Sequence, residues 1–318
     1  MTDPNQPSAR DAYASFAQRY ADIAPTKAHN ALYERPASLA LLGDVAGLAV
    51  LDAGCGPGIC SEHLARHGAT VHAFDITPEM VALARARCAG LAVEVAQGDL
   101  AAPLDWLPER AFDKILCSLA FDYVRDLAVP LREFARVARP GATLVFSMAH
   151  PMRDWMDERT RGDGTYFDTS RFGFHWSGFG EPKPYVEAWR RPLAEILNPL
   201  ADAGWRLDRF VEPTPLPQMK AVSERLHAEL SRSPAFLCIR ARLTPPTPHA
   251  RPASCAAYFC GASVSVPRNA SMSLMSCSVI AGRSPGLRSN GASVTSTFAR
   301  YCGGMSSYSS TLPSAPRG

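Results

Sequence analysis

The sequence predicts a doubly wound α/β fold, in which helices cover both faces of a mostly parallel β-sheet. Between residues 48 and 148, short apolar segments alternate with helical segments of roughly ten residues. Such strand–helix–strand units form right-handed crossovers, which place their strands parallel in one sheet. The chain has 318 residues, of which 47% are hydrophobic, so it can bury a large core.

The first half of the chain supplies most of these elements. Residues 10–23 carry aromatic side chains at helical spacing, which predicts an amphipathic helix. Strands are expected at 48–51, 71–74, 93–97, 114–118 and 143–148. Helices are expected from residue 59 onward, over 77–89 and over 126–138. The helix at 77–89 is the best defined, because Thr77 and Pro78 suit its first positions and Gly90 ends it.

Two further helix–strand pairs follow the glycine- and aromatic-rich middle of the chain. We expect helices at 193–203 and 218–231 and strands at 205–211 and 235–243. The last two strands lack a crossover of the parallel type. The sequence therefore predicts an antiparallel edge strand on the otherwise parallel sheet.

Charge and composition divide the chain after residue 243. All 30 acidic residues lie at or before Glu229, and residues 244–318 hold six of the 33 basic ones. Residues 1–243 therefore carry 27 basic against 30 acidic side chains, a charge of −3, which gives no support to nucleic-acid binding. The last 75 residues include 16 serines and show no sustained periodicity. We expect one domain over 1–243 and a disordered Ser/Pro/Arg-rich tail over 244–318.

Targeting signals and disulfides are not expected. No apolar run approaches the ~20 residues that span a bilayer, and the N-terminus lacks the pattern of a secretory signal. The nine cysteines are odd in number and irregularly spaced, which favours free thiols in a reducing compartment. We expect a cytoplasmic protein without membrane association; its oligomeric state cannot be predicted.

The strongest local pattern is a glycine loop that follows the first strand. In Val-Leu-Asp-Ala-Gly-Cys-Gly-Pro-Gly (50–58), glycine occupies every second position from Gly54 to Gly58. Glycine allows a tight turn and a close approach of the backbone to a ligand. The helix that begins near Ile59 adds N–H groups that favour a polar or anionic ligand group.

The acids around this loop distinguish two kinds of nucleotide-containing cofactor. The dinucleotide spacing G-x-G-x-x-G would need glycine or alanine at Ile59. Asp52 would repel a pyrophosphate, but it suits the cationic amino group of an amino-acid-like ligand. Asp75 and Asp99 follow the next two strands, so the carboxyl ends of three strands carry an acid. A nicotinamide-dependent oxidoreductase is therefore the weaker alternative.

Taken together, these motifs resemble the class I S-adenosylmethionine-dependent methyltransferases, which have a Rossmann-like sheet. The matching stretches are VLDAGCGPG (50–58), VHAFDIT (71–77), QGDL (97–100), FDKILCS (112–118) and RPGATLVFSMAHP (139–151). The resemblance covers about residues 10–243. It implies S-adenosylmethionine as cofactor and a small-molecule branch of the family, similar to quinone and secondary-metabolite methyltransferases.

The resemblance also implies cofactor-binding residues by position. Asp52, Gly54, Cys55 and Gly56 would line the methionine part, and Asp75 would hold both ribose hydroxyls. Asp99 would accept from the adenine amino group, with Leu100 and Ile76 packed on the ring. Ser118 would lie where the sulfonium meets the acceptor. Tyr20, with Asn30 and Tyr33, resembles the segment that covers the cofactor; Tyr20 is equally suited to the core.

The acceptor side is expected in the segment after the fifth strand. Residues 150–190 hold nine aromatic side chains beside several glycines. This composition predicts a loop-rich lid over an apolar pocket, with a packed structural insertion as the alternative. The acceptor is therefore expected to be a small hydrophobic or aromatic molecule.

His150 is the candidate general base, since it follows the fifth strand directly. A hydrogen-bonded structural histidine is the equal alternative, and His175 is a weaker candidate. Family members often carry His-Arg where this chain has Arg190-Arg191, so a catalytic histidine at that place would be missing.

No metal site is expected. Cys60, His63 and His67 share a helix face, but no fourth ligand is evident, and this face usually belongs to the core. The sequence thus predicts methyl transfer from S-adenosylmethionine to a small acceptor. A protein that binds the same cofactor without catalysis is the alternative of a different class.

Overall fold

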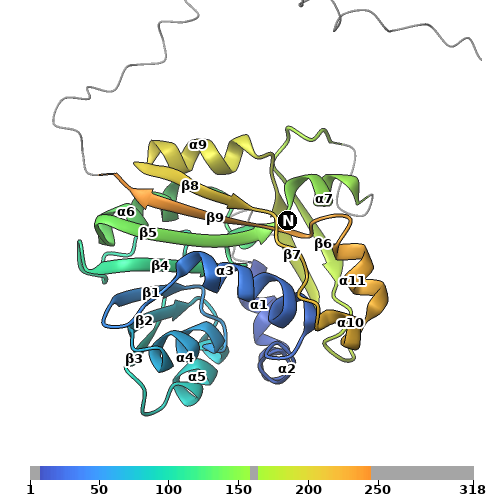
Figure 1. Cartoon of the computed structure of the whole chain (residues 1–318), viewed down its shortest axis with the longest axis horizontal. Coiled ribbons are helices and arrows are strands. Elements are labelled where there is room, and N and C mark those ends of the chain that lie inside the picture. Colours follow the sequence, from blue (N-terminus) through green and yellow to red (C-terminus); the bar gives the residue numbers. More distant parts are fainter. Residues whose placement is uncertain (1–7, 158–163, 245–318) are drawn as a thin grey trace, which may run out of the picture. The chain divides into compact units, whose positions relative to one another are not determined.

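The computed structural model describes residues 8–157 and 164–244 (Figure 1). From residue 245 onward, the expected tail lies outside these described residues. Seven strands form one sheet in the order β3-β2-β1-β4-β5-β9-β8. Their bounds are Ala49–Ala53 (β1), Thr70–Asp75 (β2), Val93–Gln97 (β3), Phe112–Ser118 (β4), Ala138–Ala149 (β5), Trp205–Val211 (β8) and Phe236–Leu243 (β9).

The first five strands run parallel, as the sequence predicts, and β9 pairs antiparallel with both β5 and β8. The predicted doubly wound sheet with an antiparallel strand is confirmed. One detail differs: the antiparallel strand β9 lies one place inside the sheet, and β8 forms the edge. The chain returns from β8 through two short helices, so β9 inserts between β8 and β5.

Helices cover both faces of the sheet. Their bounds are Ser8–Ala14 (α1), Ala17–Ile23 (α2), Arg35–Leu42 (α3), Ile59–Arg66 (α4), Pro78–Arg87 (α5), Ala128–Val137 (α6), Pro151–Met156 (α7), Ala194–Asp202 (α9), Met219–Val222 (α10) and Glu224–Leu230 (α11). A π-helical turn, Asn30–Glu34, precedes α3, and a 3₁₀ turn, Phe121–Tyr123, follows β4. Helices α3, α4 and α5 pack on one face, and α6 and α9 on the other (Figure 1).

Alternating side chains of the strands supply the two cores. Leu51 and Ile115 belong to the core under α6 and α9, whereas their neighbours Val50 and Leu116 belong to the core under α3, α4 and α5. All four side chains are fully buried. This two-sided burial explains why β1 at Val50–Leu51 and β4 at Ile115–Cys117 carry apolar side chains in succession.

Two predicted helices are each divided in the structure. The expected helix 10–23 breaks at Phe16, whose backbone leaves the helical region with φ −139° and whose side chain is buried. The expected helix 218–231 breaks at Ser223, which starts α11 by accepting a hydrogen bond from the Leu226 backbone N–H. The buried ring of Phe16 ends the first helix, and the N-cap hydrogen bond of Ser223 starts a new helix within the second. Neither break is visible in the helical periodicity of the sequence.

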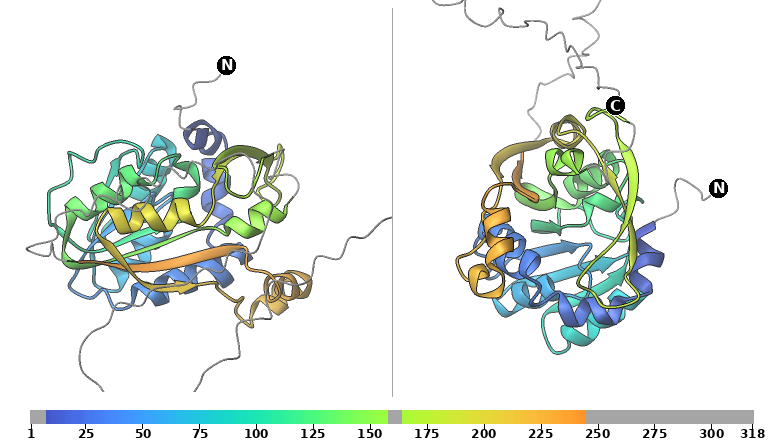
Figure 2. Two further views of the ribbon diagram at one scale, coloured as in Figure 1. Left: turned by 90° about the horizontal axis from the view of Figure 1, so that it is seen from above. Right: turned by 90° about the vertical axis from the view of Figure 1, so that its right-hand side faces the viewer.

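The aromatic segment is more regular than the loop-rich lid that the sequence predicts. It contains α7 and an antiparallel hairpin of Ser170–His175 (β6) and Tyr185–Arg190 (β7). Phe172 and Phe174 alternate along β6 and stack at 5.8 Å between ring centroids. The hairpin lies against α1 (Figure 2). The predicted aromatic-rich insertion is therefore present. It contains two strands that the sequence did not predict, because glycines interrupt the strand pattern.

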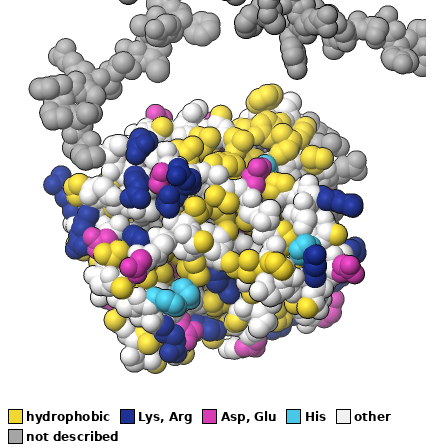
Figure 3. Space-filling model, in the orientation of Figure 1, with side chains coloured by type: hydrophobic (Ala, Val, Ile, Leu, Met, Phe, Trp, Pro, Cys, Tyr) yellow, Lys and Arg dark blue, Asp and Glu magenta, His cyan; other side chains and the backbone are white. Residues whose placement is uncertain are grey.

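The edge of the sheet is protected by charge. Exposed arginines surround Asp208 on β8, which accepts hydrogen bonds from Arg240 and Arg242 of β9 at 2.8 and 3.3 Å. In Figure 3, basic side chains gather on the side where β9 ends. These contacts lower the pKa of the Asp208 carboxyl. Charged side chains of this kind hinder edge-to-edge pairing of sheets.

Candidate functional site

A pocket of about 1130 Å³ lies at the carboxyl ends of the parallel strands. Its wall includes the segments that follow β1, β2, β3 and β4, together with parts of α7 and the hairpin. Ligands of open α/β sheets bind at this edge. The pocket brings together most of the residues that the sequence selects: Tyr20, Asp52, Gly54, Cys55, Gly56, Asp75, Ile76, Asp99, Leu100 and Ser118.

The glycine loop adopts a backbone that side chains would strain. Gly54, Gly56 and Gly58 have φ values of +73°, +53° and +78°, in the left-handed region. The Gly54 and Cys55 N–H groups both donate to the Phe74 carbonyl, which fixes the loop on β2. A Cβ on Gly56 would meet no protein atom within 4 Å, and Gly56 lines the pocket. The open space next to this glycine is available to a ligand.

Asp75 lies across from this loop, at the end of β2. Its two carboxylate oxygens accept hydrogen bonds from the Gly56 and Thr77 N–H groups, each at 2.9 Å. Burial raises the pKa of the Asp75 carboxyl, and these hydrogen bonds oppose the rise. The carboxylate is thus held in one orientation at the pocket wall, with acceptor capacity left for a diol.

Asp52, at the end of β1, is more deeply placed. Its side chain is 1% exposed and accepts a hydrogen bond from the Ser61 hydroxyl at 2.5 Å. Burial raises the pKa of its carboxyl to about 6. Asp99, after β3, accepts from the Ala101 N–H at 2.8 Å, and the buried Leu100 side chain lies next to it in the pocket wall.

A cluster of aromatic side chains from the N-terminal helices, the turn after β4 and the hairpin loop covers one end of the pocket. It consists of Tyr13, Phe16, Tyr20, Tyr123, Trp176 and Phe179. Tyr20 stacks on Phe179 of the hairpin at 5.2 Å, and the hydroxyls of Tyr13 and Tyr123 lie 2.8 Å apart. Burial raises the pKa of Tyr20 to about 12. Helices α1 and α2 and the hairpin therefore cover the pocket through shared ring contacts.

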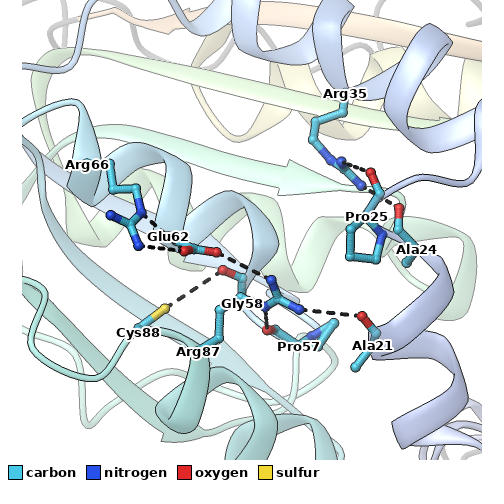
Figure 4. Close-up of polar contacts among 10 residues, drawn as sticks. All are labelled: Ala21, Ala24, Pro25, Arg35, Pro57, Gly58, Glu62, Arg66, Arg87 and Cys88. Atoms are coloured by element: carbon cyan, nitrogen blue, oxygen red, sulfur yellow. Dashed lines mark hydrogen bonds and ion pairs between the residues drawn. The ribbon is translucent and has the colours of Figure 1, made fainter.

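Two arginines bind backbone carbonyls of the N-terminal segment, and one of them, Arg87, also binds the glycine loop (Figure 4). Arg87 donates to the carbonyls of Pro57 and Ala21 at 2.9 and 3.4 Å and forms an ion pair with Glu62. Arg35 donates to the carbonyls of Ala24 and Pro25, as Figure 4 shows. Sequence analysis did not single out either residue, because both act on backbone carbonyls of distant segments.

The structure places His150 outside the pocket lining. Its Nδ1 accepts from the Met152 N–H at 3.3 Å, as the N-cap of α7, and its Nε2 lies 3.0 Å from a carboxylate oxygen of Glu212. Both ring nitrogens are therefore engaged, which is the structural alternative that the sequence left open. The exposed His175 does line the pocket.

Of the other residues that the family resemblance singles out, one lines the pocket and three are buried outside its lining. Asn30 lines the pocket, but Tyr33 is buried and its hydroxyl accepts from the Ala235 N–H. Arg190 and Arg191 are also buried, and Arg191 donates to the carbonyls of Val124 and Arg125. Arg191 thus holds the end of the hairpin to the segment after β4, whereas Arg190 donates to the Thr165 carbonyl and the Ser170 hydroxyl. Neither arginine lines the pocket.

The structure adds carboxyl groups that sequence reasoning missed. Asp122 lines the aromatic end of the pocket and accepts from the Ala149 N–H, and burial raises its pKa to about 6. Asp154 of α7 lies near it, with a pKa raised to about 8 by burial. Neither belongs to a recognisable motif, since a single Asp in a turn usually serves as a cap.

Metal-ligating groups do not gather in the part of the chain that the structure describes: no three His, Cys, Asp or Glu side chains are arranged to hold an ion. The rings of His63 and His67 instead contact each other, tilted by 30° with centroids 4.1 Å apart. Within the same residues, no helix combines the length and apolarity that a membrane span requires.

Comparison with known proteins identifies the domain. Residues 51–146 match the family described as "Methyltransferase domain". A crystal structure of an S-adenosylmethionine-dependent methyltransferase from Mesorhizobium loti shares 28% identity and a TM-score of 0.53, covering 66% of this chain and 97% of that one. Residues 51–146 therefore form a methyltransferase domain, on a fold shared with S-adenosylmethionine-dependent methyltransferases.

Curated relatives match part of this chain. A ubiquinone biosynthesis O-methyltransferase from Xanthomonas oryzae pv. oryzae is 36% identical over 146 residues, or 43% of this chain. A demethylmenaquinone methyltransferase from Tropheryma whipplei is 37% identical over 123 residues, or 37% of this chain. The chain spans 59% and 49% of the lengths of these relatives.

The lining of the pocket suits the chemical groups of S-adenosylmethionine. Three carboxylates stand at the ends of β1, β2 and β3, and the cofactor offers an ammonium group, a ribose diol and an adenine amino group. The uncrowded left-handed Gly56 leaves room for the chain of the cofactor beside the loop. A pyrophosphate, by contrast, would meet the carboxylate of Asp52 at the glycine loop.

Proposed function

We propose that this methyltransferase transfers the methyl group of S-adenosylmethionine to a small acceptor of aromatic or hydrophobic character. One observation carries the proposal: a single pocket joins the strand-end carboxylates and the glycine loop to an aromatic wall. That wall includes Tyr123, Phe172, Phe174, Trp176 and Trp189. The ubiquinone and menaquinone enzymes among the relatives are named for acceptors of the same chemical kind.

In this proposal the cofactor-binding residues keep the roles that the sequence suggests. Asp75 holds the ribose hydroxyls, and Asp99 accepts from the adenine amino group, with Leu100 and Ile76 on either side of the ring. The glycine loop, Cys55 and Asp52 surround the methionine part, and Ser118 and Tyr20 border the sulfonium. All of these residues lie within 8–244, the region to which we assign the activity.

The reaction needs alignment and, for a hydroxyl acceptor, removal of a proton. When bound, the cofactor would supply an electrophilic methyl group, and its transfer to the acceptor in one displacement would release S-adenosylhomocysteine. The aromatic wall orients the acceptor and excludes water, which contributes through proximity. Asp122 is the group best placed to accept the proton, since it lies at this end of the pocket and its pKa of about 6 keeps it ionised at neutral pH. His150 has no place in this proposal, because its ring serves α7.

A transfer assay tests the proposal. The full chain is incubated with S-adenosylmethionine labelled in the methyl group and with separate panels of phenols, catechols, quinols and amines. We expect label to move to at least one hydroxylated aromatic compound, and Asp122→Asn to slow that transfer by about 10²-fold or more, the usual contribution of a positioned base. Binding of the cofactor without transfer to any member of the panels would favour the non-catalytic alternative.

A further inference from the structure

A buried carboxylate, Glu34, stands at the pocket wall without a role in the sequence motifs. It ends the π-helical turn Asn30–Glu34, its side chain is 1% exposed, and it lines the pocket. Turns of this type often occur at functional sites. Burial of a carboxylate is costly unless a positive charge or several hydrogen bonds compensate it. The surroundings of Glu34 therefore indicate what it binds.

Three serine hydroxyls hold one oxygen of this carboxylate. Ser38 of α3, Ser118 of β4 and Ser147 of β5 donate to Glu34 Oε1 at 2.6, 2.9 and 2.6 Å. These donors come from three separate elements, so the carboxylate is fixed with respect to the sheet. Hydroxyls are neutral, however, and among the described residues no Lys, Arg or His side chain forms an ion pair with Glu34.

The second oxygen of the carboxylate, Oε2, is available to a ligand. Glu34 Oε2 accepts no hydrogen bond from the residues that the structure describes. Among these residues, only three arginine Nε atoms are fully buried without a hydrogen-bond partner, so Oε2 is not completely enclosed. This oxygen therefore has access to the pocket that Glu34 lines. A carboxylate fixed through one oxygen and accessible through the other suits a ligand with a positively charged N–H group.

The position of Glu34 indicates which part of the cofactor it meets. Asp52 and Glu34 both raise the pKa of the Cys60 thiol, so the two carboxylates lie near the same residue of α4. Ser118, which donates to Glu34, lies two residues beyond Leu116, the neighbour of Asp52 across the β1–β4 pair. Glu34 thus belongs to the methionine end of the pocket. At that end Asp52 is already engaged by Ser61.

We propose that Glu34 binds the α-ammonium group of the cofactor's methionine part through Oε2, while the three serines hold Oε1. This inference rests on the proposed function, since it takes S-adenosylmethionine as the ligand. It assigns the direct charge contact to Glu34 and leaves Asp52 as a support of the glycine loop and α4. The α-ammonium group is present in S-adenosylmethionine and in S-adenosylhomocysteine, and it is absent from 5′-methylthioadenosine.

Calorimetric titration of the full chain with these ligands tests the inference. Glu34→Gln keeps the size of the side chain and removes its charge. We expect this variant to bind S-adenosylhomocysteine and S-adenosylmethionine about 10- to 100-fold more weakly than the wild type, the scale of a lost charged hydrogen bond. Binding of 5′-methylthioadenosine, which has the same adenine, ribose and thioether, should stay within about 2-fold.

The matched control is Glu109→Gln, which removes one negative charge at an exposed position outside the pocket. It should leave all three affinities unchanged. Equal losses for S-adenosylhomocysteine and 5′-methylthioadenosine in Glu34→Gln would overturn the inference, as would no loss for either. A loss confined to S-adenosylmethionine would also overturn it, because it would place the carboxylate at the sulfonium.

Two further results keep the inference separate from the proposed function. A folded wild type that fails to bind S-adenosylhomocysteine refutes the proposed function itself. A wild type that binds it no better than 5′-methylthioadenosine refutes only the role of Glu34. If Glu34→Gln does not fold, Glu34→Asp withdraws the carboxylate by one methylene, and the same selective loss is expected.

Discussion

Replacement of Asp75 by alanine is the most direct mutational test of the ribose site. The change removes a carboxylate whose oxygens accept from the Gly56 and Thr77 N–H groups at 2.9 Å. A bound ribose would lose at least one charged hydrogen bond, which contributes about 1.5–3 kcal/mol. We therefore expect Asp75→Ala to raise the dissociation constant of S-adenosylhomocysteine by about 10- to 150-fold.

The structure also indicates how stability should respond to this change. Burial raises the pKa of the Asp75 carboxyl, so the wild type bears a desolvation cost that alanine relieves. This relief offsets the two lost backbone contacts, and the melting temperature should change little. Calorimetric titration measures the affinity, and circular dichroism checks the fold. Asp105→Ala, an exposed acid outside the pocket, is the control. An unchanged affinity in a folded Asp75→Ala would remove Asp75 from the site.

The remaining predictions concern a buried acid, the glycine loop and the histidine. The pKa of Asp52 rises from 3.8 to about 6, so Asp52→Asn should stabilise the fold at pH 8 by up to about 3 kcal/mol. The Asp52 carboxyl binds a proton more tightly in the folded wild type than in the unfolded chain, so the stability gained by Asp52→Asn shrinks as the pH falls from about 6 to 4. Equal free energies of urea unfolding for the variant and the wild type at pH 8 would contradict this prediction. Gly58→Ala should destabilise the protein by about 1–3 kcal/mol, because its Cβ would lie 3.0 Å from Ala84 at φ +78°. Gly56→Ala, whose Cβ meets no protein atom, should instead lose cofactor affinity more than stability, and thermal melts beside titrations separate the two. His150→Ala should cost about 1 kcal/mol as a lost N-cap and leave methyl transfer unaffected, whereas a 100-fold slower transfer would restore His150 as the base.

The sequence predicts the sheet and the cofactor end of the pocket because both depend on local patterns. Strand, glycine loop and helix follow one another within 49–66, Asp75 is the last residue of β2, and Asp99 lies two residues beyond β3. In a parallel sheet the carboxyl ends of the strands lie at one edge. The parallel arrangement alone therefore predicts that these residues, far apart in sequence, lie close together. The pocket accordingly contains Asp52, Asp75 and Asp99.

The rest of the pocket could not be predicted in the same way, since it depends on contacts between distant segments. Glu34 meets Ser118 and Ser147 at sequence separations of 84 and 113 residues, and no periodicity marks it. The hydroxyls of Tyr13 and Tyr123 meet across 110 residues. His150 follows β5 as expected, but the start of α7 turns its ring to cap the helix, away from the pocket. Which side of a strand end faces a ligand is decided by this tertiary context.

Titration of the full chain with S-adenosylhomocysteine, with NADH run in parallel, tests the central claim most directly. The acids at the ends of β1, β2 and β3 and the open space at Gly56 predict micromolar binding of S-adenosylhomocysteine, on the order of 8 kcal/mol, and no binding of NADH. Binding of NADH in place of S-adenosylhomocysteine, by a chain shown to be folded, would contradict the assignment of the cofactor and of the function that follows from it.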